Sequence, residues 1–409
     1  MLSTRCSLHR LATPLLAAAL GAQATDDILV STQNVLRRHT AAGALVSEVA
    51  IPYPIVPRPI TESARDLVVH ASGDVYVFNG TFTPYLSVRR AATGTWQHFP
   101  HPQWTTANSG SYGGIALYED GVFVTGSQTA LANGALLRFD IPTATFTVFA
   151  TPFVDGFLDL AIGWDGLLYA LSTSEQHIEV FDATTLQHQR TITLPFALGA
   201  RGLGVAADGT LLVATWQQGL RRFDGNGNLQ QVLTTGSRHH DLDLDACERI
   251  LCGDWGGRVI RSDSTLTGFQ QWTSGATNTF VAFAAPTVPA PAVATVRAGT
   301  PPNPTVFSGP GARLGTTWTG TLAPFLPGAL FDVVIFGAGP ANVPLPFGTY
   351  LVDENVTHFV SDYAAGGRLS VALPDNCMLT GFVFVAQAGS VSWTTCALAN
   401  ALDVRISSF

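Results

Sequence analysis

The chain has 409 residues, only 12% of them charged, and its formal net charge of −8 at pH 7 argues against a nucleic-acid partner and against binding to anionic membranes. Its 40 glycines and 24 prolines are typical of many short strands joined by tight turns. The length leaves room for two domains, each with its own core.

The first 24 residues are typical of an export signal. A basic head that ends at Arg10 precedes an apolar run, and Ala22-Gln23-Ala24 fits the small-x-small pattern of a cleavage site. The run is too short to span a bilayer and is interrupted by Pro14. We therefore predict that residues 1–24 are removed and that the mature chain is secreted, to the periplasm or the extracellular space, without membrane insertion.

A strand–turn–strand unit then recurs along the chain. Each unit has an apolar strand, a tight polar turn and a second apolar strand, and glycines in the turns lie 43 to 48 residues apart in the first four units. Two further strands follow each unit, as in "LLRFDIPTATF", and four strands per repeat make a propeller blade. The five units are Asp66–Phe78, Gly114–Gly126, Asp159–Leu171, Gly202–Ala214 and Asp241–Gly253.

The repeat also predicts how the propeller closes. Residues 278–286 supply one more inner strand, after which the pattern stops. The three missing strands match residues 27–32, 34–44 and 45–52, and "VLRRHTAAGA" there resembles "SVRRAATGT" of the first full repeat. We predict an all-β, six-bladed β-propeller over residues 25–286, with a composite closing blade of one plus three strands that leaves no open sheet edge.

The rest of the chain has a different pattern. Residues 287–300 are rich in proline and predict a stiff linker or entry segment. Residues 301–409 then contain longer strands separated by turns of Gly, Pro and Asn, and seven or eight strands over this length predict a β-sandwich domain.

The repeats resemble those of the NHL/SMP-30-like propeller superfamily, most closely in "RGLGVAADGTLLVAT", and the C-terminal region resembles β-sandwich modules that end many exported proteins of environmental bacteria. The superfamily includes lactonases, lyases, peptide-processing enzymes and binding modules, so the resemblance implies a fold more than an activity. Its lactonases hold a divalent metal with a Glu of the first blade. No Glu stands at the matching position here, and Glu62 is out of register.

Aligning the repeats places polar residues where the innermost strands begin, which is where propellers bind ligands. Asp66, Asp159 and Asp241 open the inner strands of alternate repeats, and the preceding position holds Arg65 in the first repeat. Arg201 holds that position in the fourth. One interpretation is a polar channel mouth for a small charged ligand or for Ca²⁺ held by these carboxylates. The alternative is that each Asp accepts hydrogen bonds from its own backbone.

The densest polar cluster is "SRHHDLDLD", residues 237–245. His239, His240 and Asp241 lie on one entry loop, and Trp216 and Trp255 are expected on the same face. With His240 as base and Asp241 beside it, the cluster would suit proton abstraction, and the tryptophans would stack on a sugar ring or a peptide side chain. The alternative is surface histidines with tryptophans wedged between blades.

Four cysteines remain after the signal, an even number in an oxidising compartment. Cys377 and Cys396 flank a predicted hairpin, which favours a disulfide between them. Cys247 and Cys252 share another hairpin, where a disulfide and a buried free thiol at Cys252 are both open.

The sequence holds no complete set of catalytic residues. We therefore predict a monomeric, non-catalytic protein that binds a small polar molecule, a carbohydrate or a protein partner on the channel face, with no cofactor unless Ca²⁺ binds Asp66, Asp159 and Asp241. Two alternatives stay open. One is a lyase or hydrolase, with or without a divalent metal, acting near His240 and Asp241. The other is a cell-surface interaction platform with an exposed apolar patch.

Overall fold

The protein divides into two compact units, Thr25–Pro289 and Ala290–Phe409, which are described in turn. The predicted export signal, Cys377 and Glu62 lie outside the residues that the computed structural model describes. The described residues are 27–32, 34–52, 63–80, 85–100, 113–125, 136–149, 151, 156–172, 176–195, 199–217, 219–245, 247–275, 277–284, 292–337, 339–353, 358–363, 368–373, 379–380 and 382–407.

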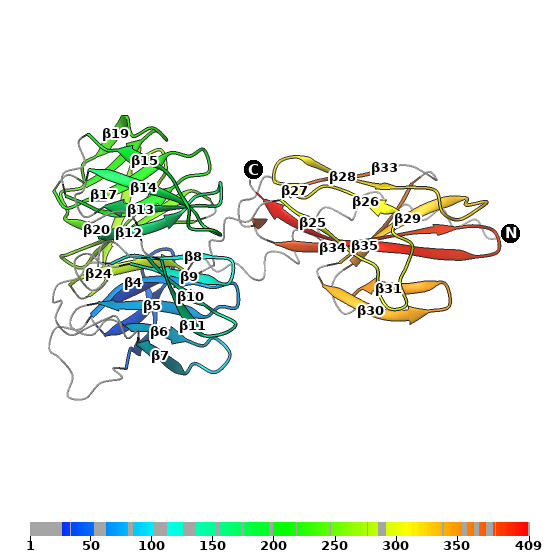
Figure 1. The fold of residues 1–409 in the computed structure, drawn as a ribbon, viewed down its shortest axis with the longest axis horizontal. Helices are drawn as coiled ribbons and strands as arrows, with labels where there is room; N and C mark the ends of the chain where they lie inside the picture. Colours follow the sequence, from blue (N-terminus) through cyan, green and yellow to red (C-terminus); the bar gives the residue numbers. More distant parts are fainter. Residues whose placement is uncertain are drawn as a thin grey trace. The chain divides into compact units, whose positions relative to one another are not determined.

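In the first unit, the described residues form six antiparallel four-stranded sheets (Figure 1). Five of them follow the chain in sequence. They are β4 (Ser63–Val69), β5 (Val75–Gly80), β6 (Tyr85–Arg89) and β7 (Trp96–Pro100); β8 (Ile115–Tyr118), β9 (Gly121–Val124), β10 (Leu136–Asp140) and β11 (Thr145–Phe149); β12 (Phe157–Ile162), β13 (Leu167–Ser172), β14 (His177–Asp182) and β15 (His188–Thr193); β16 (Ala200–Val205), β17 (Leu211–Thr215), β18 (Gly219–Phe223) and β19 (Leu229–Leu233); and β20 (His239–Leu244), β21 (Arg249–Asp254), β22 (Arg258–Asp263) and β23 (Phe269–Thr273).

The remaining sheet joins the two ends of the unit. β24 (Thr279–Phe283) pairs with β1 (Ile28–Thr32), and β2 (Val35–His39) and β3 (Leu45–Ala50) complete the sheet. In this pairing Val30 lies opposite Val281. The predicted composite blade of one plus three strands is confirmed, and it covers the edge that β24 would otherwise leave unpaired.

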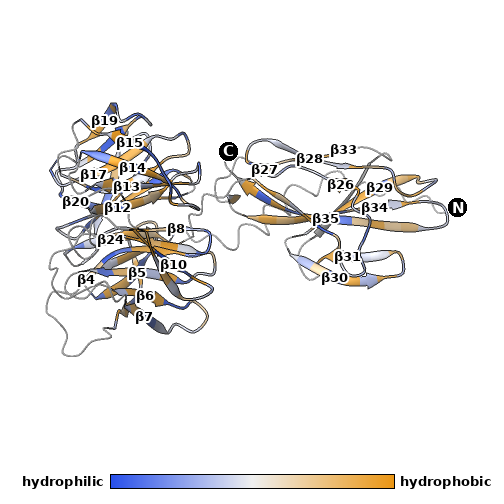
Figure 2. Ribbon diagram, in the orientation of Figure 1, coloured by the Kyte–Doolittle hydropathy of each residue, from blue (hydrophilic) through white to orange (hydrophobic). Residues whose placement is uncertain are grey.

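The innermost strands form a closed ring. β24, β4, β8, β12, β16 and β20 each contact the next, and β20 contacts β24 again. The first unit is a β-propeller. The blades are mostly hydrophobic (Figure 2) because each sheet buries its faces against its neighbours, as where Phe99 of β7 lies 4.8 Å, centroid to centroid, from Phe139 of β10.

Four of the inner strands begin with a β-bulge. The pairing register shifts across one residue in β4, β12, β16 and β20, and the skipped residues are Arg65, Leu158, Arg201 and His240. A bulged residue has no partner on the neighbouring strand, and its side chain is re-aimed relative to the regular alternation. The residue that comes directly before the first Asp or Gly of these inner strands is therefore a bulge residue in four of the blades.

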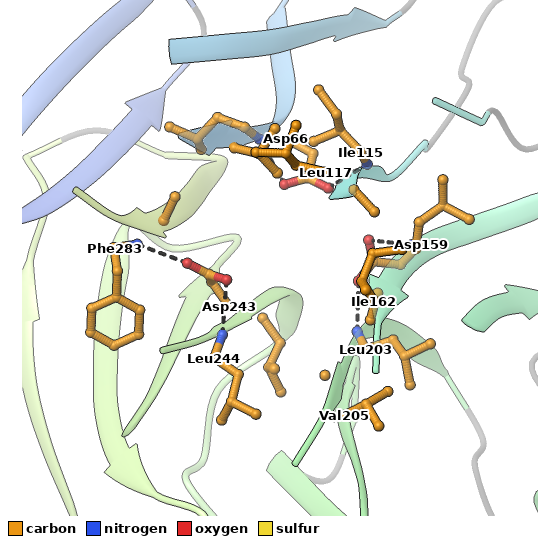
Figure 3. A pocket seen from close by; sticks show the side chains of 18 of the residues that line it. Asp66, Ile115, Leu117, Asp159, Ile162, Leu203, Val205, Asp243, Leu244 and Phe283 are labelled. Carbon is orange, nitrogen blue, oxygen red and sulfur yellow. Dashed lines mark hydrogen bonds between the residues drawn. The ribbon is translucent and has the colours of Figure 1, made fainter. Parts of the chain in front are cut away.

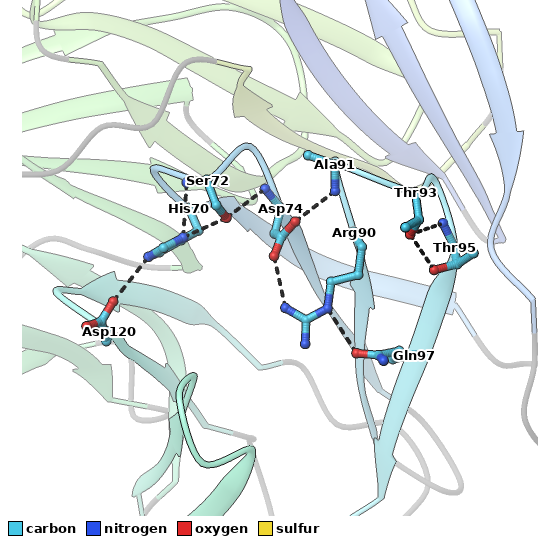
Figure 4. Close-up of polar contacts among 9 residues, drawn as sticks. All are labelled: His70, Ser72, Asp74, Arg90, Ala91, Thr93, Thr95, Gln97 and Asp120. Carbon is cyan, nitrogen blue, oxygen red and sulfur yellow. Dashed lines mark hydrogen bonds and ion pairs between the residues drawn. The ribbon is translucent and has the colours of Figure 1, made fainter. Parts of the chain in front are cut away.

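The turns at the opposite ends of the inner strands carry their own hydrogen bonds (Figure 4). Asp74 accepts hydrogen bonds from the Ala91 amide at 2.7 Å and from Arg90 at 2.9 Å. Burial alone would raise the pKa of Asp74, but these bonds lower it below its ordinary value. His70 forms an ion pair with Asp120 of the next blade, with 3.4 Å between Nε2 and Oδ1.

The second unit is a β-sandwich, as predicted. One sheet runs in the order β25 (Ala294–Arg297), β35 (Cys396–Ser407), β34 (Val383–Val391), β29 (Phe331–Gly337) and β32 (His358–Tyr363), with β27 (Ala312–Arg313) beside β35. The facing sheet has β26 (Phe307–Ser308), β28 (Thr317–Leu322) and β33 (Arg368–Ala372), and β30 (Pro340–Leu345) pairs with β31 (Gly348–Val352).

Trp318 anchors the core between these two sheets. It comes from β28, is 2% exposed, and contacts Phe336 of β29 and Phe384 of β34 at centroid distances of 6.1 and 5.5 Å. β25 lies within the predicted linker 287–300 and pairs with β35, so the last residues of that segment belong to the sandwich sheet.

The predicted disulfide between Cys377 and Cys396 is wrong, and of the two alternatives left open for Cys252 the structure has the free thiol. Cys252 is a buried free thiol, as the alternative allowed, because it sits in the middle of β21 and its Sγ donates to the Asp241 carbonyl 2.9 Å away. Cys247 lies outside that strand, in the turn before it. Cys396 is also a free thiol, and the residue opposite it across the β34–β35 hairpin is Val391.

Candidate functional site

The three aspartates that open alternate inner strands connect adjacent blades. Asp66 of β4 accepts hydrogen bonds from the amide of Leu67, at 2.7 Å, and from the amide of Ile115 on β8, at 2.8 Å. Asp159 of β12 does the same with Leu160 of its own strand, at 2.8 Å, and Leu203 of β16, at 2.6 Å. In each case one carboxylate oxygen holds the aspartate's own strand and the other holds the next blade.

Asp241 of β20 repeats the arrangement toward the composite blade, where its Oδ2 accepts from the amide of Val281 on β24. Asp243, which the sequence analysis did not single out, accepts from Leu244 at 2.9 Å and from Phe283 of β24 at 2.7 Å. Asp243 stands two residues after Asp241, and residues two apart in a strand point to the same face. This spacing could have identified Asp243 from the sequence.

Three of these residues, Asp66, Asp159 and Asp243, line a cavity of about 90 Å³ in the channel (Figure 3). Asp66, Asp159 and Asp243 point into it among residues of all six inner strands, most of them aliphatic. Burial raises the pKa of Asp159 to about 8 and that of Asp243 to about 7. Burial, and then the neighbouring carboxyl groups, also raise the pKa of Asp66 and Asp241.

The carboxyl groups do not match a metal site. Both oxygens of Asp66 and of Asp159 already accept backbone amides. In the part of the chain that the structure describes, no group of three or more His, Cys, Asp or Glu side chains is arranged to hold a metal ion. These aspartates accept hydrogen bonds from the backbone, as the alternative interpretation proposed, but from the next blade as well as from their own strand. Binding of a ligand by Asp66 and Asp159 stays a prediction.

The raised pKa of Asp159 gives the free energy of unfolding a definite pH dependence. The folded state holds this proton up to about pH 8, whereas the unfolded chain releases it near pH 4. Stability from this carboxyl is therefore fully present below pH 4 and is lost as pH rises toward 8, at up to about 1.4 kcal/mol per pH unit. We expect Asp159→Asn, which cannot ionise, to lose less stability than wild type between pH 5 and 8.

Urea denaturation at pH 5, 6.5 and 8 measures this difference. Comparing each variant with wild type at the same pH cancels the contribution of His239 and His240, which titrate in the opposite sense. Parallel pH profiles for wild type and Asp159→Asn would show that Asp159 is ionised in the folded protein at all three values.

A cluster of aromatic rings lies at the end of the channel where β20 begins. Trp216 and Trp255 follow the second strand of consecutive blades, and their ring centroids are 5.6 Å apart at 67°. His240 stands nearly perpendicular to Trp255, at 6.4 Å and 88°, and packs on Phe280 at 4.6 Å. Trp255 is 41% exposed, so this ring cluster has an open face. We call Trp216, Trp255, His240 and Phe280 the mouth cluster.

Hydrogen bonding fixes the tautomer of His240. Its Nε2 lies 2.9 Å from the carbonyl oxygen of Thr279, which can only accept, so Nε2 carries the proton. Burial lowers the pKa of His240 to about 3, which keeps the ring neutral. Its Nδ1 is then a buried acceptor that has no hydrogen-bond partner among the described residues. His239 is also buried, bonds to Thr235 through Nε2, and has a pKa lowered by burial to about 4.

Two residues beside the mouth cluster were not singled out from the sequence, although Arg238 belongs to the polar run 237–245. The guanidinium of Arg238 lies 5.6 Å from the centroid of the Trp216 ring, and the Arg238 carbonyl accepts from the Trp255 amide. The backbone N–H of Asn278 donates to the Trp255 carbonyl at 3.1 Å, and Asn278 has a positive φ of 58°. Their positions in the repeat did not indicate a role, because what brings both residues to the mouth cluster is hydrogen bonding to the backbone of Trp255.

The remaining predicted residues, Arg65 and Arg201, are half-buried at the bulges that open β4 and β16. Burial is the main cause of the lowered pKa of His240, and the hydrogen bond to Thr279 opposes it. The nearby positive charge of Arg65 lowers the pKa of His240 further. Arg201 donates to the carbonyl of Ala200 at 3.0 Å. The structure thus brings His240, Trp216 and Trp255 together, with Arg65 near them, and keeps Asp66 and Asp159 deeper, along the channel.

No protein-family model matches this chain, and no curated protein matches it. Solved structures with a similar fold include a streptogramin B lyase, at 19% identity over 60% of this chain and 78% of that chain, with a TM-score of 0.44. Virginiamycin B lyase from Staphylococcus aureus matches at 14% identity, 60% and 79% coverage and a TM-score of 0.44. A chain of a nidogen/laminin complex matches at 16%, 63% and 98%, with a TM-score of 0.48.

At these identities and TM-scores the likeness says nothing of this chain's activity, ligand or partner. A search of the described residues for a helix able to cross a membrane found none.

Proposed function

We propose that this chain is an exported β-propeller that binds a small polar ligand, without transforming it, at the mouth cluster. The observation that carries the proposal is the pair of rings, Trp216 and His240, that meet the partly exposed Trp255 edge to face, next to a buried acceptor on His240 that lacks a partner among the described residues. Aromatic faces bordered by a few fixed polar atoms are the usual lining of small-molecule sites. Export rests on the sequence pattern of residues 1–24.

The geometry favours binding over the lyase or hydrolase alternative. With a pKa of about 3, His240 is a poor general base at neutral pH. Its Nε2 is bonded to a backbone carbonyl, and Asp241 is bonded to the amide of Val281, so each is committed to holding β24.

Replacing Trp255 with alanine tests the proposal. We expect ligands found by saturation-transfer NMR, from a panel of neutral, acidic and basic small molecules, to bind the Trp255→Ala variant at least about tenfold more weakly, because the stacking surface is lost. Trp393→Ala is the matched control, since Trp393 is 88% exposed but lies in the sandwich. Ligands that bind Trp255→Ala as well as wild type would contradict the proposal.

A further inference from the structure

The mouth cluster carries unpaired acceptors beside its exposed ring. His240 Nδ1 and Asn278 Oδ1 are buried atoms without a hydrogen-bond partner among the described residues, and Asn278 bonds to the backbone of Trp255. Leaving a buried acceptor unpaired is costly, so such atoms call for a donor from a bound molecule or from water. A ligand that carries hydroxyl groups supplies donors of this kind.

An exposed arginine lies beside the mouth cluster although the chain is acidic overall. Arg238 lies over Trp216, and no ion pair joins it to a carboxylate in the described part of the chain. Other arginines of the propeller are paired in this way, as Arg258 is with Asp254 at 2.7 Å. The guanidinium of Arg238 already takes the cation position on Trp216, so a second cation would be repelled and a carboxylate would be attracted.

From these features we infer that the ligand is an acidic sugar, a pyranose ring that bears a carboxylate. The inference rests on the proposed function and specifies its ligand class. The sugar ring stacks on the partly exposed Trp255 and its carboxylate pairs with Arg238. Its hydroxyl groups donate to His240 Nδ1 and Asn278 Oδ1 once the side chains that cover these buried atoms move aside. An acidic sugar combines an apolar ring face, several hydroxyl donors and a negative charge.

Calorimetric titration with matched probes tests the inference. The probes are the trisaccharides of galacturonate, glucuronate and mannuronate, each with its methyl ester, which keeps the rings and removes the charge. Choline serves as a cationic probe. We expect at least one free acid to bind about tenfold or more tightly than its ester, with an affinity that falls as salt is raised.

Two variants separate the roles of the polar groups. Arg238→Gln should reduce binding of the acid to about the level of the ester and leave ester binding within about twofold, whereas Arg368→Gln, an exposed arginine of the sandwich, should change neither. His240→Gln keeps a donor for the Thr279 carbonyl but replaces the ring Nδ1 by an amide oxygen at a different position, so it should weaken acid and ester alike, by about fivefold.

The outcomes distinguish this inference from the proposed function. Equal affinity for acid and ester, tighter binding of choline, or no sugar binding while another panel ligand still depends on Trp255, would each overturn the acidic-sugar inference and leave the proposed function standing. If no ligand of the panel, sugars included, depends on Trp255, the proposed function falls and the inference falls with it.

Discussion

Replacing Asp159 with alanine is expected to lower the free energy of unfolding of the propeller by about 2–5 kcal/mol. The change leaves two buried amides without an acceptor, those of Leu160 and Leu203, and each unsatisfied donor costs about 1–3 kcal/mol. It also removes a link between β12 and β16, which pack side by side in the ring of inner strands. Guanidinium denaturation followed by tryptophan fluorescence measures the loss.

Asp224→Ala is the matched control for this substitution. Asp224 also accepts backbone amides, those of Asn226 and Asn228, but in an exposed turn where water can replace the carboxylate. We expect its loss to cost much less than the loss of Asp159. Equal stability of Asp159→Ala and Asp224→Ala would mean that the inter-blade bonds of Asp159 contribute nothing beyond those of an ordinary turn.

Replacing Gly114 with alanine is the second substitution for which we expect a large loss of stability, about 1–3 kcal/mol or more. A Cβ at Gly114 would lie 2.5 Å from the Cα of Asp159 and 2.5 Å from the amide nitrogen of Leu160. Backbone atoms cannot move away as a flexible side chain can, so β8 and β12 would have to separate, and the bonds made by Asp159 would be distorted. The shift in thermal unfolding temperature measures the effect.

Gly268→Ala controls for the loss of a glycine as such. Gly268 lies before β23, has no heavy atom within 4 Å of a Cβ placed on it, and does not need a positive φ. Alanine there should be neutral or slightly stabilising. If Gly114→Ala unfolds at the same temperature as Gly268→Ala, the close approach of β8 and β12 is not a constraint on the fold.

The contacts of Asp159 and Gly114 explain why Asp and Gly alternate at the start of successive inner strands. Asp opens the inner strands of the first, third and fifth repeats, and Gly opens those of the second and fourth. In the structure, Gly114 gives the backbone of Asp159 room to approach, and Gly202 does the same for Asp241, where a Cβ would lie 2.8 Å from the carbonyl carbon. The alternation therefore belongs to the packing of the blades, and nothing in it requires a bound ligand.

The candidate site was only partly predictable. Trp216 and Trp255 could be assigned to one face because they occupy equivalent positions after the second strand of two repeats, and His240 because it precedes the opening Asp. Arg238 and Asn278 could not, since what places them is contact with a neighbouring tryptophan and its backbone. The prediction of a Cys377–Cys396 disulfide failed for a similar reason, because spacing along the chain does not say which way a cysteine points from its strand.

The sequence by itself determined the β-propeller and the composite blade that joins its two ends, because strand length, turn glycines and repeat period are local properties of the chain. Only the tertiary structure decided what the channel aspartates do. Their second hydrogen-bond partners, Ile115, Leu203 and Val281, stand 40 to 49 residues further along the chain and become neighbours only when the blades pack. A carboxyl group bonded across that contact holds two blades together, and the same residue facing solvent would have been free to bind a ligand.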